Sequence, residues 1–421
     1  KQSNSCSKNK GPWIRRSTSI KGDDVATCLI GLQWGDEGKG KISHFLSDNY
    51  DVSCRFQGGG NAGHTIWHNG EKIVTHMLPV GIVNPEIVCI LGNGMVINPT
   101  ALVEEIHQVA SLLGETAGSL VSRIFISNKA HLVTEEALEV DEYRERTQML
   151  GTTKTGIGPT YESKANRTGV TAGMAAQDVL ARFPVFAATF RGRIVNTEVM
   201  INRLHGEGKR IFFEGAQGVL LDVDMGQYPY VTSSNCTAHT VGTGAGFSFG
   251  KLDRVIGVSK PYSTRVGAGP FTSAMTEEDD EAVRTLGGEF GATTGRPRKC
   301  GWLDVMALKY AVEIGGVTEI ALTKMDILSN LDAIPVCVGY TIGASEITDT
   351  LEFPYGEQWN VCEPIWEKWP GWKDGGSYHE FIAKLEEFVG VPVSIVSFGP
   401  DRESTTEINI DERVQHDIID N

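Results

Sequence analysis

The sequence predicts an α/β protein, one large domain in which a central, mainly parallel β-sheet is flanked by helices. Short apolar runs alternate with helical patterns from residue 25 almost to the end of the chain. Glycine-rich stretches follow several of these runs directly, as at residues 57–65 and 214–218. Because parallel strands end at one edge of a sheet, we expect these long loops to gather there and bind ligands.

The individual elements are predicted from local patterns. A hairpin is expected where two short alternating runs flank an Asn69-Gly70 turn. A helix is expected between Asn98, a suitable N-cap, and Gly114, a suitable stop. Buried strands are predicted at residues 29–32, 51–56, 87–91, 211–213, 255–258, 320–322 and 391–396, the last strand of the chain, with a helix at 42–46.

Two segments lack such periodicity. Residues 147–170 are rich in glycine and threonine and are predicted to form a long functional loop without regular structure. Residues 354–376 hold four of the eight tryptophans among prolines and glycines, with neither helical nor strand period. We interpret these tryptophans as filling of the core or of a partner-facing surface.

The composition limits the classes of function. The chain has 421 residues, of which 40% are hydrophobic and 22% charged, as in ordinary globular proteins. The net charge of −15 argues against a nucleic-acid partner. No apolar stretch approaches the length of a membrane span, so no membrane partner is expected either. Phosphate-bearing ligands must therefore be met by local lysine and arginine side chains.

The N-terminal residues differ from the rest of the chain. Residues 1–22 contain six lysines or arginines and no acid. We predict a disordered basic arm at 1–24, with organellar targeting as a weaker alternative, followed by a single domain at 25–421. The eight cysteines show no metal-ligand spacing and several lie in apolar runs, which favours a reducing, cytoplasmic location.

Residues 28–41 are the clearest candidate for a phosphate site. They read C-L-I-G-L-Q-W-G-D-E-G-K-G-K: an apolar strand, a glycine-rich turn and the start of a helix. The stretch departs from a Walker A loop, because Gln33 replaces its first glycine and Gly40 replaces the Mg²⁺-binding hydroxyl residue. Asp36 is the substitute metal ligand, since a carboxylate beside phosphates needs a cation or a proton. The predicted domain is thus P-loop-NTPase-like.

A second motif, Thr323-Lys324-Met325-Asp326, follows a predicted strand and resembles the guanine-reading motif of GTP-binding proteins. Asp326 can accept two hydrogen bonds from guanine that adenine cannot supply, and the stem of Lys324 can lie over the base. Together with the phosphate loop, this motif predicts GTP as the nucleotide.

Residues 291–299 form the densest basic region of this acidic chain. Arg296 and Arg298 stand two positions apart in a loop of Gly, Thr and Pro, which cannot make a helical salt-bridge face. Guanidinium groups suit carboxylates, so the loop is predicted to bind a carboxylate ligand and to close over it.

These motifs together resemble those of the adenylosuccinate synthetase family. The motif Q-W-G-D-E-G-K-G-K and the motif G-G-x-N-A-G-H-T around His64 match its signatures, and at least six motifs follow in order over residues 26–410. The resemblance implies GTP-dependent ligation of IMP and L-aspartate to adenylosuccinate, GDP and phosphate through 6-phosphoryl-IMP, the first committed step of AMP synthesis from IMP. It also implies Mg²⁺ as the cofactor and a homodimer.

The implied chemistry suits the residues. Making an amine from a purine 6-oxo group requires loss of the N1 proton and conversion of O6 into a leaving group. The resemblance implies Asp36 as the base and His64 as the acid, with Lys39 and Gln217 also catalytic. It further implies that Asp36 and the carbonyl group of Gly63 bind Mg²⁺.

The resemblance also implies which residues contact each substrate. The implied IMP contacts are Asp36, Glu37, Gly38, Lys39, Asn61, Ala62, Gly63, His64, Thr153, Gln217, Thr232, Arg296 and, from the neighbouring subunit, Arg167. The implied GTP contacts are Gly35, Asp36, Glu37, Gly38, Lys39, Gly40, Lys41, Gly63, His64, Thr65, Arg298, Lys324, Met325, Asp326, Ser397, Phe398 and Gly399. The implied L-aspartate contacts are Ala292, Thr293, Thr294, Gly295, Arg296, Pro297 and Arg298. The chain departs from the usual pattern at Gly60 and Thr155, where many members carry a polar residue and an arginine.

Two other functions stay open at this point. One is a relative that acts on another 6-oxopurine nucleotide, such as a dGMP-dependent phage homologue, against which Asp36 and the Lys324/Asp326 pair argue. The other is a GTP-binding switch without ligase activity, which would have no use for the arginines of residues 292–298.

Overall fold

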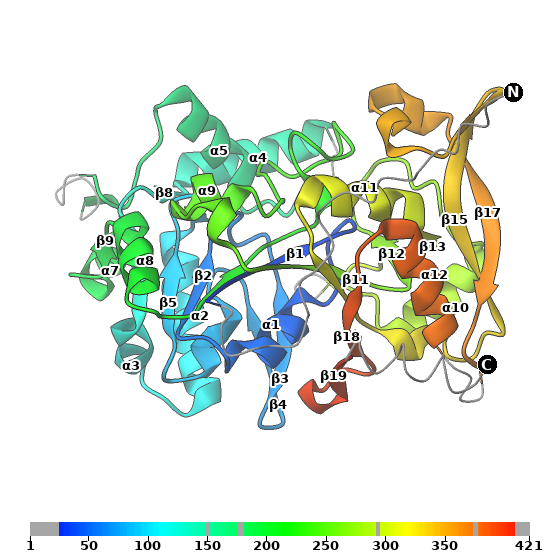
Figure 1. Cartoon of the computed structure of the whole chain (residues 1–421). Helices are drawn as coiled ribbons and strands as arrows, with labels where there is room; N and C mark the ends of the chain where they lie inside the picture. Colours follow the sequence, from blue (N-terminus) through cyan, green and yellow to red (C-terminus); the bar gives the residue numbers. More distant parts are fainter. Residues whose placement is uncertain (1–24, 149–151, 175–180, 292–294, 374–377, 409–421) are drawn as a thin grey trace, which may run out of the picture.

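The computed structural model describes residues 25–148, 152–174, 181–291, 295–373 and 378–408. Its centre is a ten-stranded sheet of described residues with helices packed around it (Figure 1). All neighbouring strands are parallel except the edge pair β18 and β19. This confirms the predicted fold class. The order is β19 (Thr405–Glu407), β18 (Val393–Ser397), β14 (Glu319–Leu322), β11 (Arg254–Ser259), β1 (Ala26–Gly31), β10 (Ile211–Glu214), β2 (Val52–Arg55), β5 (Val88–Leu91), β7 (Ile124–Ser127) and β9 (Ile194–Val195).

A smaller sheet lies beside the large one. In Figure 1 its long strands β15 and β17 run side by side at the right. One core cluster contains Ile30 of the large sheet together with Leu303 and Val336 of the small sheet, so the two sheets share a hydrophobic core. The smaller sheet consists of β12 (Tyr262–Arg265), β13 (Lys299–Asp304), β15 (Ala333–Ile342), β16 (Ser345–Ile347) and β17 (Glu363–Pro370); two short pairs are β3 (His64–His68) with β4 (Glu71–Thr75) and β6 (Val96–Ile97) with β8 (His131–Leu132).

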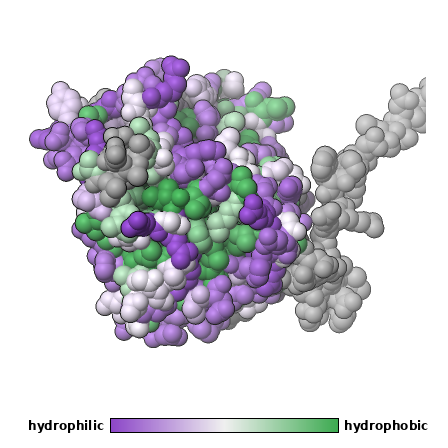
Figure 2. Space-filling view, turned by 90° about the vertical axis from the view of Figure 1, so that its left-hand side faces the viewer, coloured by the Kyte–Doolittle hydropathy of each residue, from purple (hydrophilic) through white to green (hydrophobic). Residues whose placement is uncertain are grey.

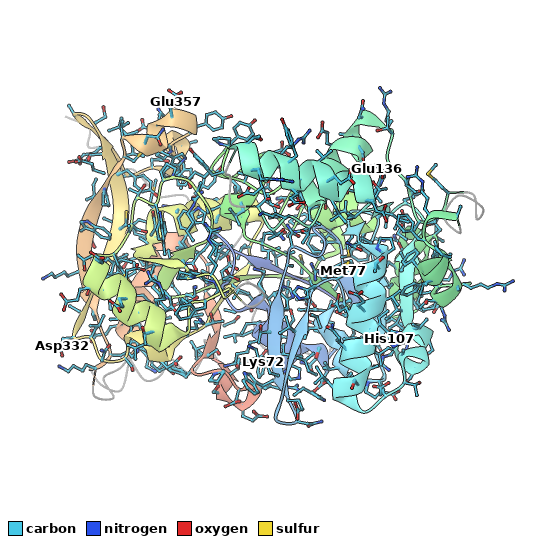
Figure 3. All side chains as sticks on the ribbon, turned by 180° about the vertical axis from the view of Figure 1, so that it is seen from behind. Lys72, Met77, His107, Glu136, Asp332 and Glu357 are labelled. Atoms are coloured by element: carbon cyan, nitrogen blue, oxygen red, sulfur yellow. The ribbon has the colours of Figure 1, made fainter. Side chains whose placement is uncertain are left out.

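Helices surround the sheets, and their side chains fill the space between the layers (Figure 3). Of the residues labelled there, Met77 is buried, whereas Lys72, His107 and Asp332 are exposed. The α-helices are α1 (Lys39–Ser47), α2 (Pro99–Leu113), α3 (Ala117–Ser122), α4 (Glu135–Gln148), α5 (Ile157–Asn166), α7 (Pro184–Thr189), α8 (Thr197–Gly206), α9 (Thr240–Ala245), α10 (Glu277–Gly287), α11 (Val305–Gly315) and α12 (His379–Val389).

Elements with strong local signals form as predicted. The β3–β4 hairpin turns at Asn69 and Gly70, whose φ angles of 51° and 81° match the turn that the Asn-Gly pair favours. At the start of α2, the Asn98 side chain accepts a hydrogen bond from the backbone N–H of Ala101, and Gly114 ends the helix in the left-handed conformation. The seven predicted buried strands all lie in the large sheet.

Three predictions about secondary structure are wrong. Residues 147–170 are not one irregular loop, because they include helix α5, which buries Ile157 and Thr160. The tryptophan-rich segment contains strand β17, which pairs with β15 along most of its length. Finally, the strand predicted at 391–396 is not the last, since β19 follows it as an antiparallel edge. The N-terminal arm predicted at 1–24 lies outside the described residues.

The topology places the candidate ligand loops together. Strand β1 lies in the middle of the sheet with β10 and β11 as its parallel neighbours, and β14 and β18 continue on the β11 side. The loops after β1, β10, β14 and β18 therefore leave from one edge. They carry the phosphate loop, Gln217, the guanine-reading motif and residues 397–399.

The backbone packs closely around Gly244 in α9, and a substitution there tests this packing. A Cβ atom added at Gly244 would collide with the carbonyl oxygen of Phe56 after β2. We expect Gly244→Ala to lower the free energy of unfolding by about 2 kcal/mol or more in urea titrations. Gly242→Ala in the same helix is the matched control, because its nearest neighbour would be 3.8 Å away. Equal stability of the two variants would contradict this packing.

One outer face carries apolar side chains. Figure 2 shows them gathered near the centre of the face at the left of Figure 1 and surrounded by polar side chains. Helix α7, at the left of Figure 1, includes the exposed apolar residue Val185, which is not a predicted site residue. Among the described residues, no helix has the length and apolarity required to cross a bilayer.

Candidate functional site

The loop between β1 and α1 has the unusual backbone of a ligand loop. Gly35, Asp36 and Gly38 all have positive φ angles, of 86°, 61° and 93°. Glycine adopts this region readily, but an aspartate there is uncommon and is held by its surroundings. Thr323 supports the turn, since its hydroxyl group donates a 2.5 Å hydrogen bond to the carbonyl oxygen of Glu37. The phosphate loop and the guanine-reading motif are therefore in direct contact.

Glu37 organises the loop from inside. Its fully buried carboxylate accepts hydrogen bonds from the N–H groups of Gln33 at 3.1 Å and Gly35 at 2.9 Å. The other oxygen lies 2.6 Å from the Nζ atom of Lys39. The side chain of Glu37 thus holds in place both the loop and Lys39, the lysine that the family resemblance implies to be catalytic.

Asp36 lies against a predicted substrate arginine. Its Oδ2 atom is 2.7 Å from the Nε atom of Arg298, and its side chain is about one-third exposed. The structure therefore brings together the predicted base and an arginine that is more than 250 residues away in sequence. Asp36 remains accessible to a ligand, whereas the Arg298 side chain is buried and only about 10% exposed.

His64 is held by a carboxylate that sequence analysis left without a role. Its Nδ1 atom lies 2.5 Å from Oε1 of Glu214, whose other oxygen accepts a hydrogen bond from the Val80 N–H group. Both side chains are buried at the carboxyl end of β10. Burial lowers the pKa of His64, and the charge of Glu214 opposes that shift. Burial would raise the pKa of Glu214, but His64 and Arg55 outweigh it and lower this pKa, which keeps the carboxylate charged.

Gln217, in the loop after β10, has a φ angle of 55°, which again indicates a constrained backbone. Its side-chain oxygen is buried without a hydrogen-bond partner among the described residues, and a ligand could satisfy it. Asn61 and Thr232 are two further predicted IMP contacts. The Nδ2 atom of Asn61 lies 3.5 Å from the hydroxyl oxygen of Thr232. The Ala62 carbonyl oxygen lies 2.7 Å from Nδ1 of His76.

The guanine-reading motif contacts residues 397–399, which the family resemblance also implies as GTP contacts. Asp326 accepts a 2.8 Å hydrogen bond from the N–H group of Gly399. Lys41, on α1, donates to the carbonyl oxygen of Gly399 at 2.7 Å and to Ser404 at 3.1 Å. Lys324, with a φ angle of 56°, extends the other way, to the Gly287 carbonyl oxygen at 2.8 Å.

We expect Lys41 to make the affinity for GTP depend on pH. Burial lowers the pKa of Lys41 to about 8, although Asp326 and other acids oppose the shift. As pH rises through 8, the ammonium loses its charge and its hydrogen bonds to the 397–399 loop weaken. We expect the KM for GTP to rise about threefold or more from pH 7 to pH 9. In Lys41→Arg, which stays charged, the increase should disappear; an unchanged pH profile would contradict this role.

Two predicted IMP residues lie in the α4–α5 region. The hydroxyl group of the exposed Thr153 lies 2.8 Å from that of Thr155, which is half-buried. Arg167 stands at the exposed C-terminal end of α5 with a φ angle of 66°.

The basic loop predicted to bind L-aspartate is described only in part. Ala292, Thr293 and Thr294 lie outside the described residues. At its base the N–H group of Gly291 donates to the Arg296 carbonyl oxygen at 2.8 Å, and Phe290 pairs with Pro297 as an isolated bridge. Gly295 has a φ angle of 64°.

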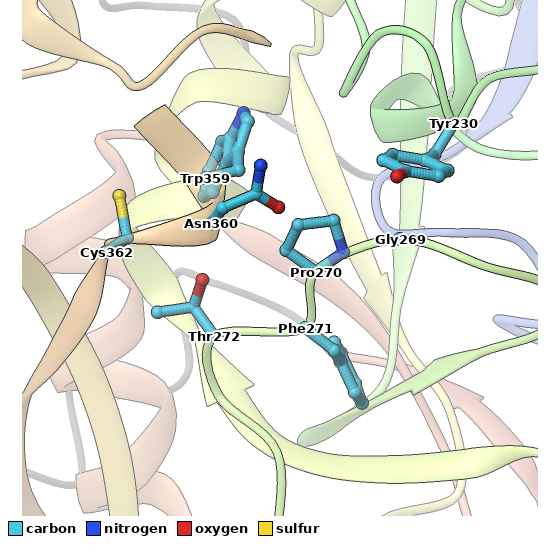
Figure 4. Close-up of a pocket in the computed structure, with 8 residues that line it drawn as sticks. All are labelled: Tyr230, Gly269, Pro270, Phe271, Thr272, Trp359, Asn360 and Cys362. Carbon is cyan, nitrogen blue, oxygen red and sulfur yellow. The ribbon is translucent and has the colours of Figure 1, made fainter. Parts of the chain in front are cut away.

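A cavity of about 480 Å³ lies between Tyr230 on one side and Trp359 and Asn360 on the other (Figure 4). Arg265, a buried cation, donates hydrogen bonds to the carbonyl oxygens of Ala268 and Pro270 at 3.2 Å each. Burial lowers the pKa of Arg265 to about 10. This arginine therefore fixes one wall of the cavity.

Fold and site together define an α/β nucleotide-dependent enzyme whose phosphate loop carries an acidic residue. Comparison with known proteins identifies the family of this enzyme. The family model for adenylosuccinate synthetase matches residues 28–181 and 171–406. The chain belongs to the adenylosuccinate synthetase family, and its reaction is the GTP-dependent ligation of IMP and L-aspartate in AMP synthesis.

Similar proteins agree with this assignment. The adenylosuccinate synthetase of Caldanaerobacter subterraneus subsp. tengcongensis is 39% identical over 425 residues, covering 90% of this chain and 98% of that protein. That of Chlorobium phaeobacteroides is 41% identical over 426 residues, covering 90% and 96%. The fully ligated enzyme of Plasmodium falciparum has a TM-score of 0.85 at 35% identity and covers 91% of this chain and 100% of its own. The succinoaminodeoxyadenylate synthetase of cyanophage S-2L, at 21% identity and a TM-score of 0.65 over 93% of this chain and 97% of its own, shares the fold.

Proposed function

We propose that ligation takes place at the edge of the large sheet, with Asp36 as the base and His64 as the acid. The observation that carries this proposal is the position of Asp36 in a strained turn of the phosphate loop, paired with Arg298. His64 belongs to the same site, because a Cβ atom on Gly40 of α1 would lie 2.9 Å from the His64 Cβ.

The proposed reaction has two steps. Asp36 accepts the N1 proton of IMP, O6 then forms a bond to the γ-phosphorus of GTP, and GDP leaves. The amine of L-aspartate next forms a bond to C6 and loses a proton, and the C6–O6 bond breaks to release phosphate, which takes up that proton. His64 hydrogen-bonds the phosphoryl oxygens in both steps and stabilises their developing charge, while Lys39 and Gln217 stabilise and orient the substrates.

The residues proposed to bind Mg²⁺, Asp36 and the carbonyl group of Gly63, offer the oxygen ligands that this ion prefers. Asp36 supplies an accessible carboxylate, and Mg²⁺ commonly takes one or two carboxylates together with phosphate oxygens and waters. No group of three or more acidic, histidine or cysteine side chains suited to a metal occurs among the described residues, so substrate phosphates would complete the site. Asp36 and the Gly63 carbonyl group would hold the ion, which neutralises phosphate charge when bound.

The other substrates are assigned by charge and geometry. Asp326 would accept hydrogen bonds from guanine beside residues 397–399, while Lys324 would lie along the base. The arginines of residues 292–298 would bind the carboxylates of L-aspartate, and the loop would close over it.

We also propose a homodimer in the cytoplasm. The exposed position of Arg167 at the end of α5 suits a contact with the IMP phosphate bound to a partner subunit. Buried free thiols such as Cys28 and Cys89 suit a reducing compartment.

A comparison of IMP and dGMP as substrates tests the proposed function. Purified protein with GTP, Mg²⁺ and L-aspartate is expected to change the absorbance of IMP but not that of dGMP, and to release GDP only when L-aspartate is present. GDP release without L-aspartate would favour a GTP-binding switch. Turnover of dGMP in place of IMP would favour the phage-like alternative.

A further inference from the structure

Glu289 is a fully buried carboxylate between α10 and the basic loop, and neither step of the reaction uses it. Its Oε1 atom accepts hydrogen bonds from Lys260 at 3.0 Å, from the Tyr262 hydroxyl group at 2.6 Å and from Lys324 at 2.8 Å. Its Oε2 atom accepts one from Nη1 of Arg298 at 2.6 Å. One side chain thus joins a guanine-reading lysine to an arginine of the predicted aspartate loop.

The charges of Glu289, Lys260, Lys324 and Arg298 influence one another strongly. Burial alone would raise the pKa of Glu289, but the charges of Lys260, Lys324 and Arg298 hold it well below its ordinary value. Lys260 is also fully buried, and burial lowers its pKa while Glu289 opposes the shift. An unpaired buried charge costs folding free energy. Loss of the Glu289 carboxylate would therefore leave Lys260, Lys324 and Arg298 without the negative charge that they share.

Backbone contacts extend the connection in both directions. The carbonyl oxygen of Glu289 accepts a 3.0 Å hydrogen bond from the N–H group of Arg298, which closes the base of the basic loop. The Nε atom of Arg298 then reaches Asp36 at 2.7 Å. A continuous series of contacts therefore runs from Lys324 through Glu289 and Arg298 to Asp36.

We propose that Glu289 is a positioning residue that couples the guanine-reading motif to the aspartate loop. The proposal rests on the substrate roles assigned above. Removal of the charge releases Lys324 and Arg298 together, so binding of GTP and of L-aspartate weakens at the same time. IMP binding depends mostly on loops elsewhere, including those of Gln217 and Thr232, and is affected less.

Steady-state kinetics of Glu289→Gln tests this coupling. The KM values for GTP and L-aspartate are each expected to rise about tenfold, whereas the KM for IMP rises less than about threefold. Glu319→Gln is the matched control, because Glu319 is an equally buried carboxylate paired with Arg254 at 2.7 Å in the neighbouring strands β14 and β11. It is expected to lower thermal stability while leaving all three KM values within about twofold.

The outcomes separate the proposals. An inactive wild-type enzyme would overturn the proposed function, whereas an active wild type with unchanged KM values in Glu289→Gln overturns only the coupling. An equal rise in all three KM values also overturns it, since that result indicates a general structural defect. If Glu289→Gln does not fold, Glu289→Asp retains the charge with a shorter reach and is expected to raise both KM values about threefold. Unchanged values in that variant contradict the proposal.

Discussion

Asp36→Asn is expected to lower kcat by at least about 10³-fold while GTP still binds, because the amide keeps the shape of the carboxylate but cannot accept the N1 proton. The loss should exceed that of an ordinary general base, since the same carboxylate is proposed to contact Mg²⁺. Steady-state assays with saturating IMP, GTP and L-aspartate measure kcat, and equilibrium binding of a GTP analogue measures the retained affinity.

Asp48→Asn is the matched control for this variant. Asp48 caps the other end of α1 and pairs with Arg402 at 2.6 Å, at the surface. Its replacement should leave kcat within about twofold, as for most surface substitutions. Normal turnover in Asp36→Asn would refute the assignment of the base.

Glu214→Gln is expected to lower kcat by about 10²-fold, because the carboxylate orients His64 and stabilises its protonated form. Removing that charge lowers the pKa of His64 further below its ordinary value, in the same direction as burial. The protonated imidazole is then present only at lower pH, so the alkaline limb of the kcat profile should shift to lower pH. A pH–rate profile measures this shift.

A double-mutant cycle provides the control for Glu214. If the carboxylate acts through the imidazole, Glu214→Gln added to His64→Asn should cost less than about threefold more in kcat. Additive losses would show that Glu214 acts independently of His64. An unshifted profile in the single variant would contradict the electrostatic role.

Elements that depend on local signals could be predicted from the sequence. The β1 run, the Asn69-Gly70 turn and the caps of α2 each contain their own signal, and the structure confirms them. Helix α5 was missed because its short buried face, Ile157 and Thr160, stands in a glycine- and threonine-rich stretch. Strand β17 was missed because its regularity comes from pairing with β15, which the sequence does not show.

The predicted site residues were those inside recognisable loops. Glu214 and Glu289 were missed for a common reason: a single acid beside an apolar or glycine-rich stretch has no distinctive pattern. Their roles come from partners far away in the chain, such as His64 for Glu214, 150 positions apart, and Lys324 for Glu289, 35 positions apart. Only the folded sheet edge brings these charges together. The motif E-G-A-Q-G after β10 was the one available hint for Glu214.

A crystal structure with IMP, a non-hydrolysable GTP analogue and Mg²⁺ tests the central assignment most directly. We expect a carboxylate oxygen of Asp36 within hydrogen-bond distance of purine N1, another on the metal ion, and Asp326 facing guanine. A structure in which Asp36 lies away from the purine, still paired only with Arg298, would contradict the account.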